Sequence, residues 1–151
     1  MIVDAQIAII ASGAAVWNAM TDIEGATNII KGILGIEIIE KPSTGLVGLR
    51  WRETRMLFGK PATVEKWITD AIEGKFYTTR AESDGYIFLA TTSIAENGNG
   101  SVTSTTSHDS LPQTLAARLS SPMMLLFKGV ARKALLQDLQ DIKTAVERTP
   151  T

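Results

Sequence analysis

The middle of the chain contains six strand-like segments joined by short turns, and this feature constrains the fold more than any other. The segments are rich in β-branched and aromatic residues and cover residues 35–41, 46–57, 62–72, 75–82, 86–95 and 101–109. The connections carry Pro, Gly, Asn and Asp, most clearly at Asn97–Gly100. Parallel neighbours need crossovers of a dozen or more residues, so these strands must form an antiparallel meander.

Three further elements are expected before the meander. Residues 2–10 are apolar on both faces of an extended chain, which predicts a strand lying between neighbours. Ser12 is a suitable N-cap for a short helix over residues 13–20. Thr21 and Glu24 have the spacing of a capping box, which predicts a second short helix over residues 22–30.

The last third of the chain has the pattern of one long amphipathic helix, from Pro112 to about Arg148. Residues 122–127 are bulky and apolar almost all round, whereas the later apolar positions form a regular stripe: Leu135, Leu139, Ile142 and Val146. We expect the first half to roof a pocket and the second half to pack on the sheet. Pro122 lies within the pattern and predicts a kink or a restart of the helix.

Length and composition limit the class of protein. A chain of 151 residues predicts a single domain over residues 1–151, and 44% hydrophobic with 21% charged residues is typical of a globular protein with an ample core. A net charge of −1 without a basic block argues against nucleic acid as the main partner. No apolar run approaches 20 residues and the start does not look like a signal peptide, so we expect no stable membrane insertion and a cytoplasmic location.

The residue inventory also limits the chemistry. The chain has no cysteine, which excludes disulfides, thiolate catalysis and cysteine-ligated metals. It has one histidine and no clustered carboxylates, so we expect no metal site and no cofactor. Edge strands of a sheet can pair between molecules, which leaves a homodimer open.

These elements together predict an α+β fold. Seven strongly twisted antiparallel strands tend to curl, and the concave face then needs a cover. The C-terminal helix is the element long enough to provide it. We therefore expect a seven-stranded curved antiparallel sheet with two short helices and a long C-terminal helix over a cavity.

The chain resembles a known superfamily over essentially its whole length. The segments that carry the resemblance are Ala14–Asn18 with Thr21-Asp22, Gly48–Thr54, Gly100–Thr103, and Leu139–Lys143 with Glu147. They are similar to the START/SRPBCC superfamily, and more narrowly to its bacterial polyketide cyclase/dehydrase-type members. The resemblance implies the helix-grip fold and a cavity between helix and sheet, and it carries over no fixed catalytic motif.

Glu53 is the first candidate for chemistry. It alternates with Trp51 along one strand, so the two side chains share a face. A carboxylate in an apolar pocket has a raised pKa and could serve as an acid, a base or a ligand anchor. The alternative is that Glu53 lies near the strand end and pairs with a nearby arginine.

His108 is the second candidate and shares strand parity with Val102, Ser104 and Thr106. An inward-facing imidazole could act as a general base near neutral pH. The alternative is an exposed or hydrogen-bonded histidine at a strand end. Ser107 and Asp109 point to the opposite face from His108, so Ser107-His108-Asp109 cannot form a hydrolase triad.

The expected apolar lining consists of aromatic and methionine side chains, which suit a pocket that adapts to an apolar or aromatic ligand. These candidates are Trp51, Tyr77, Tyr86, Phe88, Met123, Met124 and Phe127. The same residue types also fill ordinary cores, and the sequence leaves both uses open.

Three functions follow from these residues. The first is binding of a hydrophobic or amphipathic small molecule (a lipid, polyketide or aromatic compound) between the sheet and the C-terminal helix. The second is a cyclase or dehydratase that uses Glu53 or His108 as acid or base and orients its substrate through the pocket. The third is a protein-binding module, which the polar outer strand faces support least.

Overall fold

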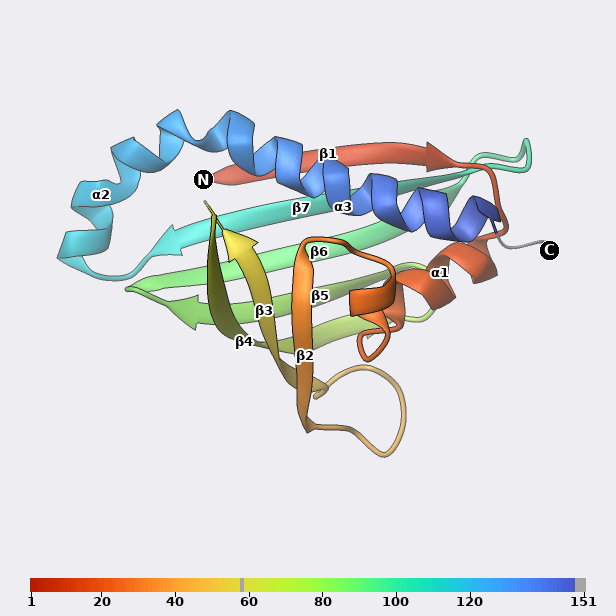
Figure 1. Cartoon of the computed structure of the whole chain (residues 1–151), viewed down its shortest axis with the longest axis horizontal. Coiled ribbons are helices and arrows are strands. Elements are labelled where there is room, and N and C mark those ends of the chain that lie inside the picture. The colour runs from red at the N-terminus through yellow and green to blue at the C-terminus, as the bar shows by residue number, and fades with distance from the viewer. Residues whose placement is uncertain (58, 149–151) are drawn as a thin grey trace.

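The computed structural model describes residues 1–57 and 59–148 and shows a seven-stranded antiparallel sheet with helices on one face (Figure 1). The strands are β1 (Ile2–Ile9), β2 (Ile33–Glu40), β3 (Arg50–Leu57), β4 (Lys60–Ile72), β5 (Phe76–Ser83), β6 (Tyr86–Glu96) and β7 (Val102–Pro112). Their order in the sheet is β1-β7-β6-β5-β4-β3-β2, with every neighbouring pair antiparallel. The predicted meander is confirmed, and β1 joins it beside the last strand.

Two strand boundaries differ from the prediction by three or more residues. The segment predicted to begin at residue 46 turns first, and β3 starts at Arg50. Gly48 has a φ of +95°, a conformation that a strand cannot contain, and its N–H donates to the Ile68 carbonyl at 3.0 Å. At the other end, β7 continues past Asp109 to Pro112, because its full length pairs with β6.

The first helix forms as predicted and the second does not. Helix α1 (Gly13–Thr21) begins at its N-cap Ser12, whose hydroxyl accepts from the Ala15 N–H at 3.1 Å. The predicted helix over residues 22–30 is wrong, since the structure has only the 3-10 turn η1 (Ala26–Asn28) there. Asp22 accepts from the Gly25 N–H at 3.0 Å, so a local turn takes the place of the expected capping box.

The C-terminal helix is two helices rather than one. Helix α2 (Leu115–Leu126) has Thr114 as its N-cap, and α3 (Lys128–Arg148) follows after a break at Phe127. Pro122 lies inside α2, so the predicted restart at this residue is wrong and the break comes five residues later. Phe127 has φ −99° and ψ 5°, and Gly129, a weak helix former, follows two residues on.

Helix α3 runs along β1 and caps its outer edge (Figure 1). Arg132 donates to the Asp4 carbonyl and Lys143 to the Ala8 carbonyl, both at 3.1 Å. Glu147 accepts from the Ile10 N–H at 2.9 Å. These side chains satisfy backbone groups that an edge strand otherwise leaves open, so β1 is protected from further pairing. The other edge strand is β2, and pairing of β2 between two molecules stays a prediction.

The main core lies where α1 and the second half of α3 meet the sheet. It contains Ile9, Val16, Trp17, Met20, Val102, Ile142 and Val146. A second cluster under η1 contains Ile23, Leu49, Trp51 and Ile68. The packing role was predicted for Leu135, Leu139, Ile142 and Val146. It is confirmed for Leu139, Ile142 and Val146, which are buried, whereas Leu135 is half-buried.

The outer face of β3 and β4 is polar. Arg50 donates to Glu65 at 3.0 Å and lies over the Trp67 ring, 4.3 Å from its centroid. Arg52 pairs with Glu37 at 3.3 Å. The outer face predicted for Arg50 and Arg52 is therefore present: Arg52 lies opposite Glu65 in the strand register, and Arg50 pairs with Glu65 diagonally. Within the described residues, no helix is long and apolar enough to cross a membrane.

Candidate ligand-binding site on the inner face of the sheet

The inner face of the sheet, which we define as the face toward α1 and α3, carries both candidate residues for chemistry. Strand alternation places Glu53 on the same face as the buried Trp51. On β7, His108 shares its face with Val102 and Ser104, both fully or almost fully buried. The sequence expectation that Glu53 and His108 point to one side of the sheet agrees with this register.

Glu53 is held by three donors. Its Oε2 accepts from Arg55 Nε at 2.6 Å and from Lys66 Nζ at 3.0 Å. Its Oε1 accepts from Trp51 Nε1 at 3.3 Å. The carboxylate is only 5% exposed, and two cations compensate the loss of water.

This pairing sets the protonation state of Glu53. Burial by itself raises the pKa of the carboxyl group, and it is the largest single influence. The charges of Lys66 and Arg55 and their hydrogen bonds together outweigh burial and lower the pKa to about 2. The raised pKa expected from the sequence is wrong, and the alternative of an arginine partner is correct. Glu53 is therefore ionised at neutral pH and has no proton to donate.

Arg55 extends this cluster to the helix above. Its guanidinium donates to both oxygens of Asp138 on α3, at 3.3 Å from Nη1 and 2.8 Å from Nη2. This bidentate pair joins β3 to α3 across the inner face, while other α3 side chains hold β1. Burial raises the pKa of Asp138 above its ordinary value, and Arg55 opposes that shift.

We call Glu53, Arg55, Lys66 and Asp138 the inner-face ion cluster. It holds two anions and two cations, and all but Glu53 are partly exposed. An ammonium group has three N–H donors. Among the described residues the Lys66 ammonium has one hydrogen-bond partner, Glu53, so two of its donors are free for another acceptor.

His108 lies beside this cluster and next to an aromatic pair. Burial, the largest influence, and the charges of Lys66 and Arg55 together lower the pKa of His108 to about 4. The imidazole is therefore neutral at pH 7. Its ring is 6.1 Å from that of Phe88, which stacks on Tyr86 at 5.7 Å. His108 and Phe88 are both half-buried.

Three of the predicted lining aromatics hold the fold together. Trp51 is 2% exposed and packs in the second core cluster. The Tyr77 hydroxyl donates to the Met20 carbonyl at 3.0 Å, and burial raises its pKa to about 12. The Tyr86 hydroxyl donates to the Ala117 carbonyl at 2.7 Å, which fixes α2 to the start of β6. A ligand contact of these three residues stays a prediction.

The structure does not bring all of the predicted helix residues to the sheet. Met123 and Phe127 are exposed, and Met124 is half-buried. The residues of α2 that face the protein are the buried Ala117 with its neighbours Ser120 and Ser121. Met123 and Phe127 therefore do not roof a pocket in this arrangement, and their contact with a ligand stays a prediction.

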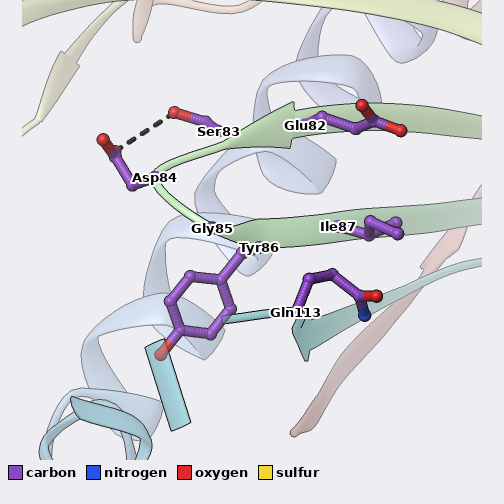
Figure 2. A pocket seen from close by; sticks show the side chains of 7 residues that line it. All are labelled: Glu82, Ser83, Asp84, Gly85, Tyr86, Ile87 and Gln113. Atoms are coloured by element: carbon purple, nitrogen blue, oxygen red, sulfur yellow. Dashed lines mark hydrogen bonds between the residues drawn. The ribbon is translucent and has the colours of Figure 1, made fainter. Parts of the chain in front are cut away.

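Two shallow hollows lie at other places on the surface. The larger, of about 280 Å³, is at the β5–β6 hairpin and is lined by Glu82, Ser83, Asp84, Gly85, Tyr86, Ile87 and Gln113 (Figure 2). The other, of about 220 Å³, lies between the end of α1 and the β2–β3 loop. Neither is lined by a residue of α2 or α3, so neither is the cavity that the sequence predicts under the helix.

Sequence reasoning missed three of the four members of the inner-face ion cluster as site residues. Arg55 follows Glu53 by two positions and therefore shares its face, which alternation alone could have indicated. Lys66 faces inward because it lies opposite Trp51 in the register of β3 and β4, and this register cannot be read from the sequence. Asp138 flanks the apolar stripe of α3, between Leu135 and Leu139. The described residues contain no group of three or more His, Asp or Glu side chains placed to hold a metal ion.

Comparison with known proteins shows which of them have this fold. No family model and no curated protein matches the chain. Solved structures do match it. A START superfamily protein from Mycobacterium smegmatis superposes with a TM-score of 0.80 at 17% identity, covering 97% of each chain. The chain has the helix-grip fold of the START superfamily.

Two enzymes share this fold at similarly low identity. The ZhuI aromatase/cyclase from Streptomyces sp. R1128 has a TM-score of 0.81 at 14% identity, covering 98% of this chain and 94% of that one. Norcoclaurine synthase from Thalictrum flavum, in complex with dopamine and hydroxybenzaldehyde, has a TM-score of 0.74 at 14% identity, covering 100% and 88%. These likenesses confirm the predicted helix-grip fold.

Proposed function

We propose that the chain binds a small hydrophobic or amphipathic molecule against the inner face of the sheet, beside α3. The proposal rests on Lys66, whose ammonium group has two N–H donors without a partner among the described residues, on the same face as the half-buried pair Phe88 and His108. A protein site for such a ligand combines apolar surface with a few fixed polar groups, and these residues supply both.

The chemistry of the site indicates which ligands suit it. Lys66 and the edge of the Arg55 guanidinium offer positive N–H donors, which favour a carbonyl, phenolate or carboxylate oxygen. The Phe88 ring offers a face for stacking with an aromatic or conjugated body. The solved structures named above support this class, since one is an aromatase/cyclase and another was solved with two small aromatic compounds.

A cyclase or dehydratase activity is the second candidate, and the state of His108 favours it. A neutral imidazole can accept a proton from a carbon next to a carbonyl, while a carbonyl oxygen bound at Lys66 would draw off the developing charge. Its pKa of about 4 makes His108 a weak base, so most of the acceleration would come from orientation of the substrate. Glu53 is not part of this proposal as an acid, because it is already ionised.

Binding is tested with naphthalene carboxylate, a probe that has a flat apolar body and one anionic group. Lys66→Met should weaken its affinity about tenfold, the value of one charge-assisted hydrogen bond. Lys75→Met is the matched control, since Lys75 is exposed and lies outside the inner face. This variant should bind the probe with the affinity of the unmodified chain. Thermal melts of both variants show whether each remains folded. Equal affinities for the Lys66 and Lys75 variants would contradict the proposed anchor.

A second variant tests the apolar half of the site. Phe88→Ala removes the stacking face and leaves the inner-face ion cluster in place, so it should also weaken the probe. Native mass spectrometry of the purified protein then searches for a co-purified molecule of the proposed class. If naphthalene carboxylate binds neither the original chain nor any variant, the proposed ligand class is wrong.

A further inference from the structure

Helix α2 turns its small and polar side toward the protein and its large apolar side toward solvent, the reverse of a helix that packs on a core. Its small and polar residues face inward, since Ala117 is buried and Ser120 and Ser121 lie around the Tyr86 hydroxyl. Its large apolar residues face outward: Leu119 is 73% exposed and Leu126 is 79% exposed. Core packing does not explain this arrangement, because the leucines lie on the side away from the sheet.

The outward residues form one continuous stripe. Leu115, Leu119, Met123 and Leu126 follow each other at steps of four, four and three positions, which places them on a single face of α2. All four are exposed, and Leu125 and Val130 add exposed apolar surface beside them. We call Leu115, Leu119, Met123 and Leu126 the α2 stripe. It lies at the end of the molecule where α2 leaves the sheet (Figure 1).

The sequence segment that contains the α2 stripe has basic residues and no acidic ones. Residues 110–137 contain Arg118, Lys128, Arg132 and Lys133 and no Asp or Glu. This segment therefore carries +4, which leaves 11 basic and 16 acidic residues, a net charge of −5, in the rest of the chain. A protein of net charge −1 thus concentrates its positive excess around its most exposed apolar helix.

Neighbouring elements contribute few opposing charges. Arg132 donates to the backbone carbonyl of Asp4, and Asp84 lies on the hairpin next to Thr114 at the start of α2. Asp109 pairs with the amino group of Met1, and Asp138 pairs with Arg55. Among the described residues, none of the four basic side chains of segment 110–137 is in an ion pair.

We infer that α2 docks on the surface of a bilayer that contains anionic phospholipids. An exposed apolar stripe next to basic side chains is the pattern of helices that lie in the membrane interface, with the apolar face buried at the level of the headgroups. The four cations would meet lipid phosphates, each strengthening binding by about fivefold at low salt. The charge favours this partner over a second copy of the chain, because two α2 segments of +4 would repel each other.

Docking does not depend on the proposed function. It would place the end of the inner face next to a membrane, where apolar molecules accumulate. The docked helix lies on the surface, in keeping with the finding that no helix among the described residues is both long and apolar enough to cross a membrane.

Co-sedimentation with vesicles tests the inference. The unmodified chain should bind vesicles of equal parts phosphatidylcholine and phosphatidylglycerol, bind vesicles of phosphatidylcholine alone at least tenfold more weakly, and lose binding as salt is added. Leu119→Glu should reduce binding to the mixed vesicles at least tenfold. Leu34→Glu, on the exposed part of β2, is the matched control and should bind as the unmodified chain does.

A spectroscopic readout locates the contact. The chain has no cysteine, so Leu119→Cys gives one site for an environment-sensitive dye. Its emission should shift to the blue with mixed vesicles, whereas the same dye at Leu34→Cys should not respond. Absence of vesicle binding would overturn the inference, and so would equal binding to both kinds of vesicle. Self-association that Leu119→Glu abolishes, without vesicle binding, would overturn it too and assign the α2 stripe to a dimer.

Discussion

Replacing Glu53 by glutamine removes the central charge of the inner-face ion cluster while keeping the shape of the side chain. The amide oxygen can still accept hydrogen bonds, but the −1 charge that holds Arg55 and Lys66 is lost. Removing one partner of a buried ion pair leaves the other charges without compensation, which destabilises the folded state. We expect Glu53→Gln to be less stable than the original chain at neutral pH.

The lowered pKa of Glu53 sets the magnitude. A fall from 4.5 in the unfolded chain to about 2 in the folded protein corresponds to about 3 kcal/mol. This stability is fully present above pH 4.5, where the carboxyl group is ionised in both states. It is lost as the pH falls from 4.5 to about 2, because the unfolded chain then takes up the proton first.

Urea unfolding at a series of pH values measures the effect. Glu53→Gln should lose about 3 kcal/mol at pH 7 relative to the original chain, and the difference should shrink toward pH 2. Glu37→Gln is the matched control, because Glu37 pairs with Arg52 on the exposed face and should cost less than 1 kcal/mol. If both variants lose the same amount, or if the loss for Glu53→Gln does not change with pH, the assignment of a buried ionised Glu53 is refuted.

Three further substitutions test other parts of the structure. His108→Gln should abolish a loss of about 3 kcal/mol that the original chain shows as the pH falls from 6.5 to about 4, because the unfolded chain binds the His108 proton first; urea titrations across that range decide it. Tyr86→Phe removes the hydrogen bond to the Ala117 carbonyl and should cost about 1 kcal/mol, with faster amide hydrogen exchange in α2 than in α3; equal exchange rates would contradict the anchoring role. Ser104→Ala should leave stability unchanged or raise it by up to about 1 kcal/mol, since the buried Ser104 hydroxyl has no hydrogen-bond partner among the described residues; a clear loss in thermal melts would show a hidden partner.

The fold was predictable because local signals agree with one another. Turn residues such as Asn97–Gly100 and Asp84-Gly85 join alternating segments, and short connections permit only antiparallel neighbours. The Ser12 N-cap predicted the start of α1 correctly. The start of the second helix was predicted wrongly because Thr21 can serve either helix. Its hydroxyl donates to the Trp17 carbonyl at the end of α1, so it does not begin the next helix.

The C-terminal helix shows the limit of periodicity. The apolar spacing runs without interruption through Phe127, and nothing in it reveals that the axis breaks there. Pro122 was the natural place to expect the break, yet it lies inside α2, which continues to Leu126. The sequence identified residues 122–127 as apolar almost all round, but it could not tell which of them face the sheet and which face solvent.

The sequence predicted on which face of the sheet the candidate residues lie, but it did not predict their protonation states or partners. Alternation placed Glu53 and His108 on the inner side of the sheet. The direction of the Glu53 pKa depends on Lys66, which reaches it from the next strand, and on Arg55, whose contact depends on side-chain geometry. Cross-strand register and helix docking, which bring Asp138 to Arg55, are tertiary facts that a single sequence does not contain.

The histidine signal in nuclear magnetic resonance tests the proposed ligand site most directly. His108 is the only histidine, so the imidazole region contains one set of signals and needs no assignment. Without ligand, these signals should titrate with a pKa of about 4. Addition of naphthalene carboxylate at pH 7 should shift them, and Lys66→Met should require about tenfold more probe for the same shift. Signals that stay in place while the probe binds elsewhere would contradict a ligand site on the inner face of the sheet.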